Sequence, residues 1–224
     1  MAKTIIHNES GSALWGASDH LQVAQTRSFA SLIFELLSEK VPTDAELKVF
    51  ELILILSIDH GPDTPSAVKV IEAAKAGKSI SEAISTGIME INDVHGGAQE
   101  KLMEILYQVQ SGEWKVQSLI EEYLKEGKRL AGFGHRIYKD VDPRAQLILK
   151  VLMEECKGES QEWINIATDL EKELEVQKGS KLPLNIDGAI AVALCSFGWD
   201  PKLGKAVFII ARTPGLCGQY LNNT

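Results

Sequence analysis

The sequence is poor in cysteine and has no apolar run long enough to cross a membrane. Its three cysteines, Cys156, Cys195 and Cys217, are odd in number and widely spaced, which favours buried free thiols over a disulfide framework or a zinc site. The apolar run at residues 49–56 stops well short of the ~20 residues that a membrane-spanning helix needs. The N-terminus also lacks the basic and then apolar pattern of a signal peptide, so we expect a cytoplasmic protein without a membrane partner.

The sequence has no excess of basic residues either. It carries 31 acidic and 23 basic side chains over 224 residues, a net charge of -8, which argues against a general nucleic-acid binder. A local anion site is compatible with this charge, because Lys and Arg cluster around residues 125–150 and 172–181. With 45% hydrophobic and 24% charged residues, the composition is that of an ordinary globular protein.

A third absence is the alternation of apolar and polar residues that is typical of strands. Apolar residues instead recur every three or four positions, which predicts an almost entirely helical chain of nine to eleven elements. Residues 1–19 show no periodicity and predict an irregular segment. The segment 47–58 is apolar nearly all round, which favours a central, buried helix. The expected helices cover about 18–37, 43–58, 66–76, 79–91, 97–110, 114–126, 145–155, 160–176, 188–197 and 203–210.

The most informative stretch is the glycine-rich segment 130–144, which ends in an arginine. Gly132 and Gly134 can adopt backbone angles closed to other residues and let a ligand approach the main chain. His135 and Arg144 add a titratable imidazole and a fork that can bind a carboxylate at two points. The alternative is a loop that enters a helix, with Asp142 as N-cap, Pro143 at the first helical position and both charges in solvent.

Several other polar residues stand where a glycine or proline is expected to interrupt a helix. Each has an alternative role: His60 can interact with a helix dipole, and Asp187 can be an N-cap worth about 1 kcal/mol. Five such coincidences are better explained by one site than by five separate helix ends. The residues are His60, His95, His135, Asp187 and Arg212.

Three histidines, a carboxylate and two arginines suit proton abstraction beside a carbonyl group. The carboxylate can accept a proton from carbon, the histidines can donate to developing oxyanions, and the arginines can hold carboxylates. A zinc site of three His and one Asp is the rival use of these residues. No His pair has the i, i+4 spacing of familiar helical zinc ligands, and two arginines would repel the metal.

The motif GFGHRIYK at residues 132–139, followed by DPR at 142–144, resembles the signature of the citrate synthase superfamily. The resemblance covers roughly 45–221 and implies an all-α, citrate synthase-like multi-helical fold. It also implies a single unit over 1–224, with a large helical core and a small helical lobe at about 112–180. Four more segments follow in the family's order, namely DH at 59–60, VHGGAQE at 94–100, NID at 185–187 and AR at 211–212.

The resemblance implies a homodimer or higher homo-oligomer that acts on acetyl-CoA, citryl-CoA and oxaloacetate. It implies no metal and no cofactor beyond the coenzyme A thioester as substrate. Carried over residue by residue, it assigns catalytic roles, contacts to the dicarboxylate and contacts to coenzyme A. The catalytic residues are His95, His135 and Asp187. The contacts to the dicarboxylate are His60, Arg144 and Arg212. The contact to coenzyme A is Lys139, with Arg136 and Lys178 as weaker candidates.

The DHGP run at 59–62 and the NIDGAI run at 185–190 most resemble the citryl-CoA lyase module, which also forms the end of ATP-citrate lyase. We therefore slightly favour citryl-CoA cleavage. His95 instead resembles the synthases, so citrate synthase or a 2-methylcitrate-type relative is the alternative. Thr64 stands where many synthases carry an asparagine, and no counterpart is found for the arginine that a neighbouring subunit contributes in them. A non-catalytic CoA-binding or assembly subunit is the alternative of another class.

Overall fold

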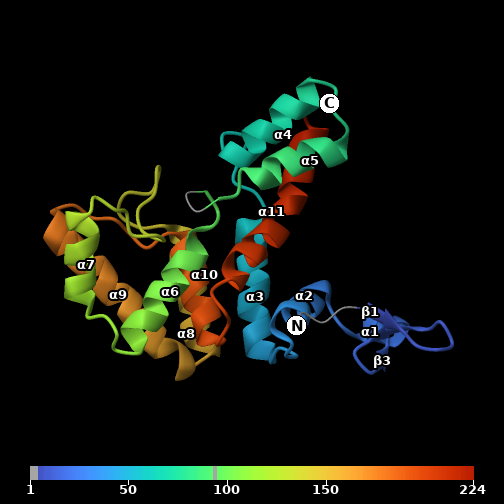
Figure 1. The fold of residues 1–224 in the computed structure, drawn as a ribbon, viewed down its shortest axis with the longest axis horizontal. Coiled ribbons are helices and arrows are strands. Elements are labelled where there is room, and N and C mark those ends of the chain that lie inside the picture. The colour runs from blue at the N-terminus through green and yellow to red at the C-terminus, as the bar shows by residue number, and fades with distance from the viewer. Residues whose placement is uncertain (1–4, 93–94) are drawn as a thin grey trace. The chain divides into compact units, whose positions relative to one another are not determined.

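The computed structural model describes residues 5–92 and 95–224 and contains eleven helices and one small sheet in those ranges (Figure 1). The expected all-α class and the expected number of helices are confirmed. No helix within the described ranges is long and apolar enough to span a membrane. The helices are α1 (His20–Thr26), α2 (Phe29–Ser38), α3 (Asp44–Ser57), α4 (Pro65–Lys75), α5 (Ile80–Met89), α6 (Ala98–Gln110), α7 (Val116–Lys125), α8 (Pro143–Glu155), α9 (Glu159–Lys178), α10 (Ile186–Ser196) and α11 (Leu203–Leu221).

The chain divides into two compact units, Met1–Glu51 and Leu52–Thr224. In the first unit, strands β1 (Ile5–His7), β2 (Ala13–Trp15) and β3 (Ser18–Asp19) form an antiparallel sheet in the order β1-β2-β3. The sequence predicts no strand here, since runs of two or three residues are too short to show alternation. The single unit expected over 1–224 and the small lobe expected at 112–180 stay predictions.

The helix expected at 18–37 is two helices, because the chain is extended at Arg27. Ser28 then begins α2, and its Oγ accepts a hydrogen bond from the Ser31 N–H at 3.1 Å. A serine at this position satisfies one of the free donors of the new helix. Glu35 of α2 is 2% exposed and accepts the indole N–H of Trp15 at 2.9 Å, which attaches β2 to α2.

The second unit is organised around α10, which is buried along nearly its whole length. It packs against α6, α8, α9 and α11, while α4 and α5 pack against each other and against α11. Gly87 explains the close approach of α5, since an added Cβ would lie 2.5 Å from a Val70 methyl group and 3.0 Å from the Ser66 carbonyl oxygen. A glycine inside a helix costs roughly 1 kcal/mol relative to alanine, and here it is what lets α5 approach α4 so closely.

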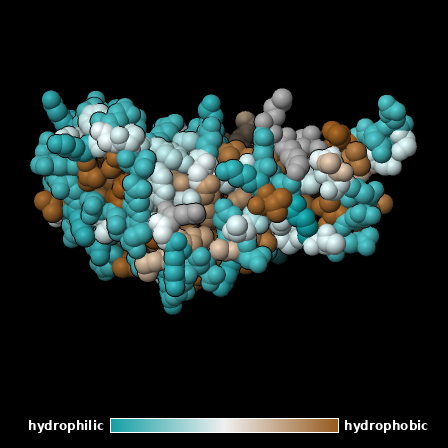
Figure 2. Space-filling view, turned by 90° about the horizontal axis from the view of Figure 1, so that it is seen from below, coloured by the Kyte–Doolittle hydropathy of each residue, from teal (hydrophilic) through white to brown (hydrophobic). Residues whose placement is uncertain are grey.

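Two more helix expectations are wrong. The helix expected at 203–210 does not end there, because α11 continues through Pro214 to Leu221. A proline costs a helix one hydrogen bond and some strain, and here both are tolerated in a helix held by its packing. The segment 47–58 is not buried all round: Phe50 and Ile53 are fully buried, but Ile55 is 64% and Ile58 48% exposed. Apolar patches of this kind interrupt the hydrophilic surface in Figure 2.

Candidate active site

The glycine-rich loop 130–142 is attached to the start of α10 by backbone contacts. The Gly132 carbonyl accepts the Asn185 N–H at 3.0 Å, and the Gly134 N–H donates to the Pro183 carbonyl at 2.8 Å. A Cβ on Gly132, where φ is +81°, would lie 2.9 Å from the Gly188 Cα. The structure therefore explains Gly132 by close packing of the loop on α10, whereas the sequence interpretation was that it makes room for substrate.

Asp187 lies in the first turn of α10 but does not cap it. Asn185 is the N-cap, and its side chain accepts the Gly188 N–H at 3.2 Å. The N-cap alternative for Asp187 is therefore wrong, and its carboxylate is available for another role. Its Oδ1 accepts a hydrogen bond from Gln99 Nε2 at 2.8 Å. Burial raises the pKa of Asp187 to about 6, against the opposing effect of the Arg212 and Arg144 charges.

Asp142 caps α8, as the sequence predicts, through the Arg144 N–H at 3.0 Å. The same carboxylate binds the Arg144 guanidinium at two points, with Nε at 3.0 Å and Nη2 at 2.8 Å. It also accepts the Ile186 N–H at 3.1 Å, so one side chain joins α8 to the start of α10. The alternative in which Arg144 extends into solvent is wrong, because only 14% of its side chain is exposed.

The Arg144 guanidinium lies between two histidine rings. Nη1 is 3.2 Å from His60 Nδ1, and Nη2 is 3.2 Å from His135 Nε2. Burial and the Arg144 charge lower the pKa of both histidines, which favours neutral rings at pH 7. A guanidinium at this distance from both rings also disfavours a metal cation between them.

The protonated nitrogen of His135 follows from its backbone contacts. Its Nδ1 accepts hydrogen bonds from the N–H groups of Ile137 and Tyr138, both at 3.0 Å. A neutral imidazole has one acceptor and one donor, so the proton is on Nε2. Nε2–H and Arg144 Nη2 are then two donors that face each other. An oxygen atom of a carbonyl or carboxylate would satisfy both, which marks this position as an oxyanion site.

His95 is held in place by Asn92, which contacts its backbone, and by Ser66, which contacts its ring. Its backbone N–H donates to the Asn92 carbonyl at 3.0 Å, and its Nε2 is 2.9 Å from the hydroxyl oxygen of Ser66, which is fully buried. Burial, followed by the Arg212 and His60 charges, lowers the pKa of His95 to about 4, so the ring is neutral at pH 7. Residue 94 of the VHGGAQE motif lies outside the described residues.

Arg212 enters the site from the middle of α11 and is 4% exposed. Its Nε donates to the Ser57 carbonyl at 2.8 Å, and its guanidinium carbon lies 4.7 Å from the centre of the Phe208 ring. Burial lowers its pKa, while the Asp59 and Asp187 charges oppose that effect. Arg212 therefore places a fixed positive charge near Asp187 and His95, whose pKa values respond to it.

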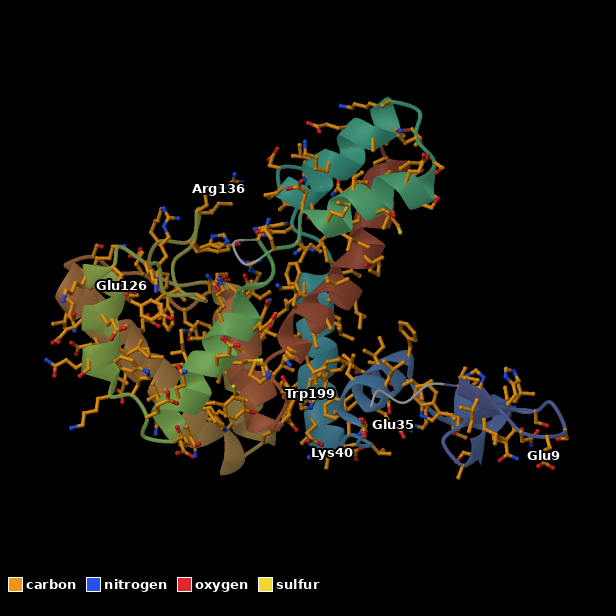
Figure 3. All side chains as sticks on the ribbon, in the orientation of Figure 1. Glu9, Glu35, Lys40, Glu126, Arg136 and Trp199 are labelled. Atoms are coloured by element: carbon orange, nitrogen blue, oxygen red, sulfur yellow. The ribbon has the colours of Figure 1, made fainter. Side chains whose placement is uncertain are left out.

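The three candidate CoA contacts are all exposed. Lys139 is attached to the site, since its Nζ donates to the His135 carbonyl at 3.2 Å. Arg136 lies at the outer end of the loop in Figure 3, and Lys178 is the last residue of α9. The sequence analysis missed Ser66 and Gln99. Gln99 is an amide on a mostly apolar helix face, which is a weak signal, and nothing in the sequence connects Ser66 with His95.

A family model described as the C-terminal domain of citrate synthase matches residues 2–224. The chain belongs to this family. The resemblance drawn from the GFGHRIYK and DPR motifs is thereby confirmed, and the citrate synthase-like fold with it.

The solved structure of citryl-CoA lyase from Hydrogenobacter thermophilus is similar over the whole chain. The two share 33% identity with a TM-score of 0.90, and the match covers 100% of this chain and 86% of that one. The probable ATP-citrate synthase of Caenorhabditis elegans is 28% identical over 83% of this chain and 18% of its own length. The citrate/2-methylcitrate synthase of Bacillus subtilis (strain 168) is 29% identical, over 89% and 54% respectively. The chain thus spans about half or less of these two curated relatives.

Proposed function

We propose that this protein makes or breaks the carbon–carbon bond between acetyl-CoA and oxaloacetate, with cleavage of citryl-CoA as its main reaction. The observation that carries the proposal is the position of Asp187. It is a buried carboxylate with a pKa raised to about 6, and the charges of Arg212 and Arg144 act on it. The Arg212 charge also acts on the neutral His95. A base with a pKa near neutrality can both accept a proton from carbon and return it.

Each residue has a role in the proposed reaction. In the direction of synthesis, Asp187 accepts a proton from the acetyl methyl group and His95 donates a hydrogen bond to the thioester oxygen as the enol forms. The Nε2–H of His135 donates to the keto oxygen of oxaloacetate, which can also accept the second N–H of Arg144 Nη2, the first being donated to Asp142. His60, Arg144 and Arg212 hold the two carboxylates. Cleavage uses the same groups in reverse, with protonated Asp187 returning its proton to the acetyl carbon.

The similarity to a citryl-CoA lyase over the whole chain favours cleavage over synthesis. Citrate synthase, or a 2-methylcitrate-type relative, is the second candidate, and the neutral His95 held by Ser66 is the observation that favours it. A non-catalytic CoA-binding or assembly subunit is the candidate of another class. The cytoplasmic location stays a prediction.

We further propose that Lys139 binds the phosphates of coenzyme A, with weaker contributions from Arg136 and Lys178. Lys139 is exposed, yet its Nζ is fixed on the His135 carbonyl, so a cation is held beside the proposed keto site. Only their charge and their exposure support Arg136 and Lys178 as contacts to coenzyme A. Lys139→Ala should raise the KM for the CoA thioester without changing the affinity for oxaloacetate, and Lys150→Ala, on the exposed side of α8, is the control.

Two assays separate the candidate activities. Citryl-CoA is supplied and oxaloacetate is measured, and in a second assay acetyl-CoA and oxaloacetate are supplied and free thiol is measured. A lyase forms oxaloacetate and releases little thiol, whereas a synthase releases thiol rapidly. The control is Asp187→Asn, which should abolish whichever activity is present. If the wild type and Asp187→Asn are equally inactive and bind CoA equally well, the catalytic proposal is wrong.

We also propose that the protein is a homodimer or a higher homo-oligomer. Ile55, in the last turn of α3, and Ile58, just after the helix, are 64% and 48% exposed. Burial of such side chains against a second copy removes apolar surface from water. Light scattering at micromolar concentration tests this, and Ile55→Glu should shift the mass toward that of a monomer. A monomeric mass for the wild type would contradict the proposal.

A further inference from the structure

Gln99 is a buried amide in direct contact with the proposed base. It is fully buried in the first turn of α6, and its Nε2 donates to Asp187 Oδ1 at 2.8 Å. Its stem is held from the other side by α11, since a Cβ on Gly204 would lie 2.8 Å from the Gln99 Cβ. The side chain is therefore fixed at its root, and its amide group points at the carboxylate.

The other end of the amide is unusual, because the buried Gln99 Oε1 has no hydrogen-bond partner among residues 5–92 and 95–224. A buried acceptor without a partner is destabilising, and native proteins contain few of them. Rotation of the amide by 180° exchanges Nε2 and Oε1. With Asp187 ionised, Nε2 is the right group to face it. With Asp187 protonated, Oε1 is the right group, since a carboxylic acid has an O–H to donate.

We propose that Gln99 is a positioning residue for Asp187, which donates to the carboxylate and, after rotation of its amide, accepts a hydrogen bond from the protonated acid. The inference rests on the proposed function, in which Asp187 alternates between these two states. In synthesis the methyl C–H bond breaks, its proton forms an O–H bond on Asp187, and the electron pair remains on the enolate. Cleavage returns the same proton to carbon. Gln99 supports both states and does not itself gain or lose a proton.

The charges that act on Asp187 come from two other elements. They are Asp142 and Arg144 at the start of α8 and Arg212 in α11. Gln99 is the neutral partner from α6. Loss of the Gln99 amide takes a hydrogen bond from both forms of Asp187. The bond to the ionised carboxylate is charge-assisted and the stronger of the two, so its loss dominates and the pKa of Asp187 should rise.

The variant that tests the proposal is Gln99→Met, which keeps the length of the side chain and removes both polar groups. The first measurement is a 13C NMR titration of the Asp187 carboxyl group, assigned by its absence in Asp187→Asn. We expect the midpoint to move upward by about one pH unit. The Gln99 side-chain amide resonances of the wild type should titrate with the same midpoint as Asp187. An unchanged carboxyl midpoint in Gln99→Met would overturn the proposal, whether or not the protein turns over citryl-CoA.

The second measurement is kinetic. In the direction of synthesis, Gln99→Met should lower kcat about 10- to 100-fold and shift the acid limb of its pH profile upward, with the KM for oxaloacetate unchanged. A purely structural role would lower activity without moving that limb. Glu100→Gln is the matched control, since Glu100 is the next residue and pairs at 3.7 Å with Lys205. Glu100→Gln should leave the acid limb of the kcat pH profile at its wild-type pH.

Gln99→Glu provides a second test that does not depend on the folding of Gln99→Met. It preserves shape but places a second carboxyl group against Asp187, and two such groups cannot both ionise easily. The pair should titrate in two steps, with the upper step above the wild-type midpoint. A single wild-type-like step would overturn the proposal. Wild-type protein that is inactive but shows the expected NMR shifts would contradict the proposed function and leave the Gln99–Asp187 coupling established.

Discussion

Asp142 binds Arg144 through both of its carboxylate oxygens, at 3.0 Å and 2.8 Å, and neither side chain is free to move away. The Asp142 side chain is completely buried and that of Arg144 is 14% exposed. The pair fixes the guanidinium between His60 and His135, where a planar fork can meet a carboxylate at two points.

Replacement of Asp142 by Asn should therefore affect substrate binding more than the chemical step. The amide can still accept the Arg144 N–H but brings an NH2 group against the guanidinium and leaves a buried charge without its partner. We expect the KM for oxaloacetate to rise at least tenfold, and the protein to lose about 3 kcal/mol of stability in urea unfolding. The exposed carboxylate of Asp140 provides the control, and Asp140→Asn should change neither quantity.

Much of the fold could be predicted from the sequence because its helices carry strong local signals. Thr43 and Glu46, for example, have the Thr-x-x-Glu spacing that signals the start of a helix, and they form a capping box. The Glu46 N–H donates to Thr43 Oγ1 at 3.2 Å and the Thr43 N–H to Glu46 Oε2 at 2.7 Å. The errors occur where tertiary packing overrides a local signal. Pro214 predicts a helix end, but it lies inside α11 because the following Gly215 packs closely on Ile58.

The candidate site could be proposed from the sequence for the residues that lie within two positions of a glycine or proline, namely His60, His95, His135, Asp187 and Arg212. For Arg212 the expected interruption itself is wrong, since α11 continues past it. The residues that hold them were not. Ser66 is 29 positions from His95 and Gln99 is 88 from Asp187, so each contact exists only after the helices have packed. No local pattern records a hydrogen bond across such a distance in sequence.

The Ser66–His95 contact predicts a specific loss of rate. Without the hydroxyl group, the His95 ring loses the partner that fixes its orientation at the proposed enol oxygen. Ser66→Ala should reduce kcat about tenfold in citryl-CoA cleavage and leave the affinity for oxaloacetate unchanged. Ser85→Ala is the control, because Ser85 is exposed and bonds only within α5, to the Ser81 carbonyl. A kcat for Ser66→Ala equal to that of this control would show that the hydroxyl does not act through His95.

The raised pKa of Asp187 predicts a cost in stability at neutral pH. An acid whose pKa is higher in the folded than in the unfolded state holds its proton longer when folded, so folding is favoured at low pH. That contribution falls as pH rises from about 4, the usual aspartate value, to about 6, the folded value. Asp187→Asn should remove this fall and stabilise the protein by ~3 kcal/mol at pH 7.

The measurement is the free energy of urea unfolding at half-unit steps between pH 4 and 7, with the wild type and Asp187→Asn in parallel. The difference between the two proteins isolates Asp187 from other groups that titrate in this range, His95 among them. His95 has the opposite sign, because its lowered pKa makes stability rise with pH between about 4 and 6.5. A difference that stays constant with pH would contradict the raised pKa of Asp187.

Two glycines of α11, Gly215 and Gly218, provide a matched pair of variants that tests how closely this helix packs against the end of α3. A Cβ on Gly215 would lie 1.9 Å from the Ile58 carbonyl oxygen and 3.0 Å from the Asp59 Cβ, whereas a Cβ on Gly218 would meet nothing within 4 Å. Gly215→Ala must therefore push α11 away from residues 58–59. We expect a loss of at least ~2 kcal/mol of stability and weaker binding of oxaloacetate, since Arg212 is carried on this helix and bonded to Ser57.

Gly218→Ala should have the opposite effect, because an alanine inside a helix costs less conformational entropy than a glycine and has open space here. A gain of up to ~1 kcal/mol is expected, with oxaloacetate affinity unchanged. The comparison is internal to one helix, so it separates the steric contact at Ile58 from any general effect of alanine on α11. Equal stabilities and equal oxaloacetate affinities for the two variants would mean that α11 does not approach Ile58 as closely as the structure has it.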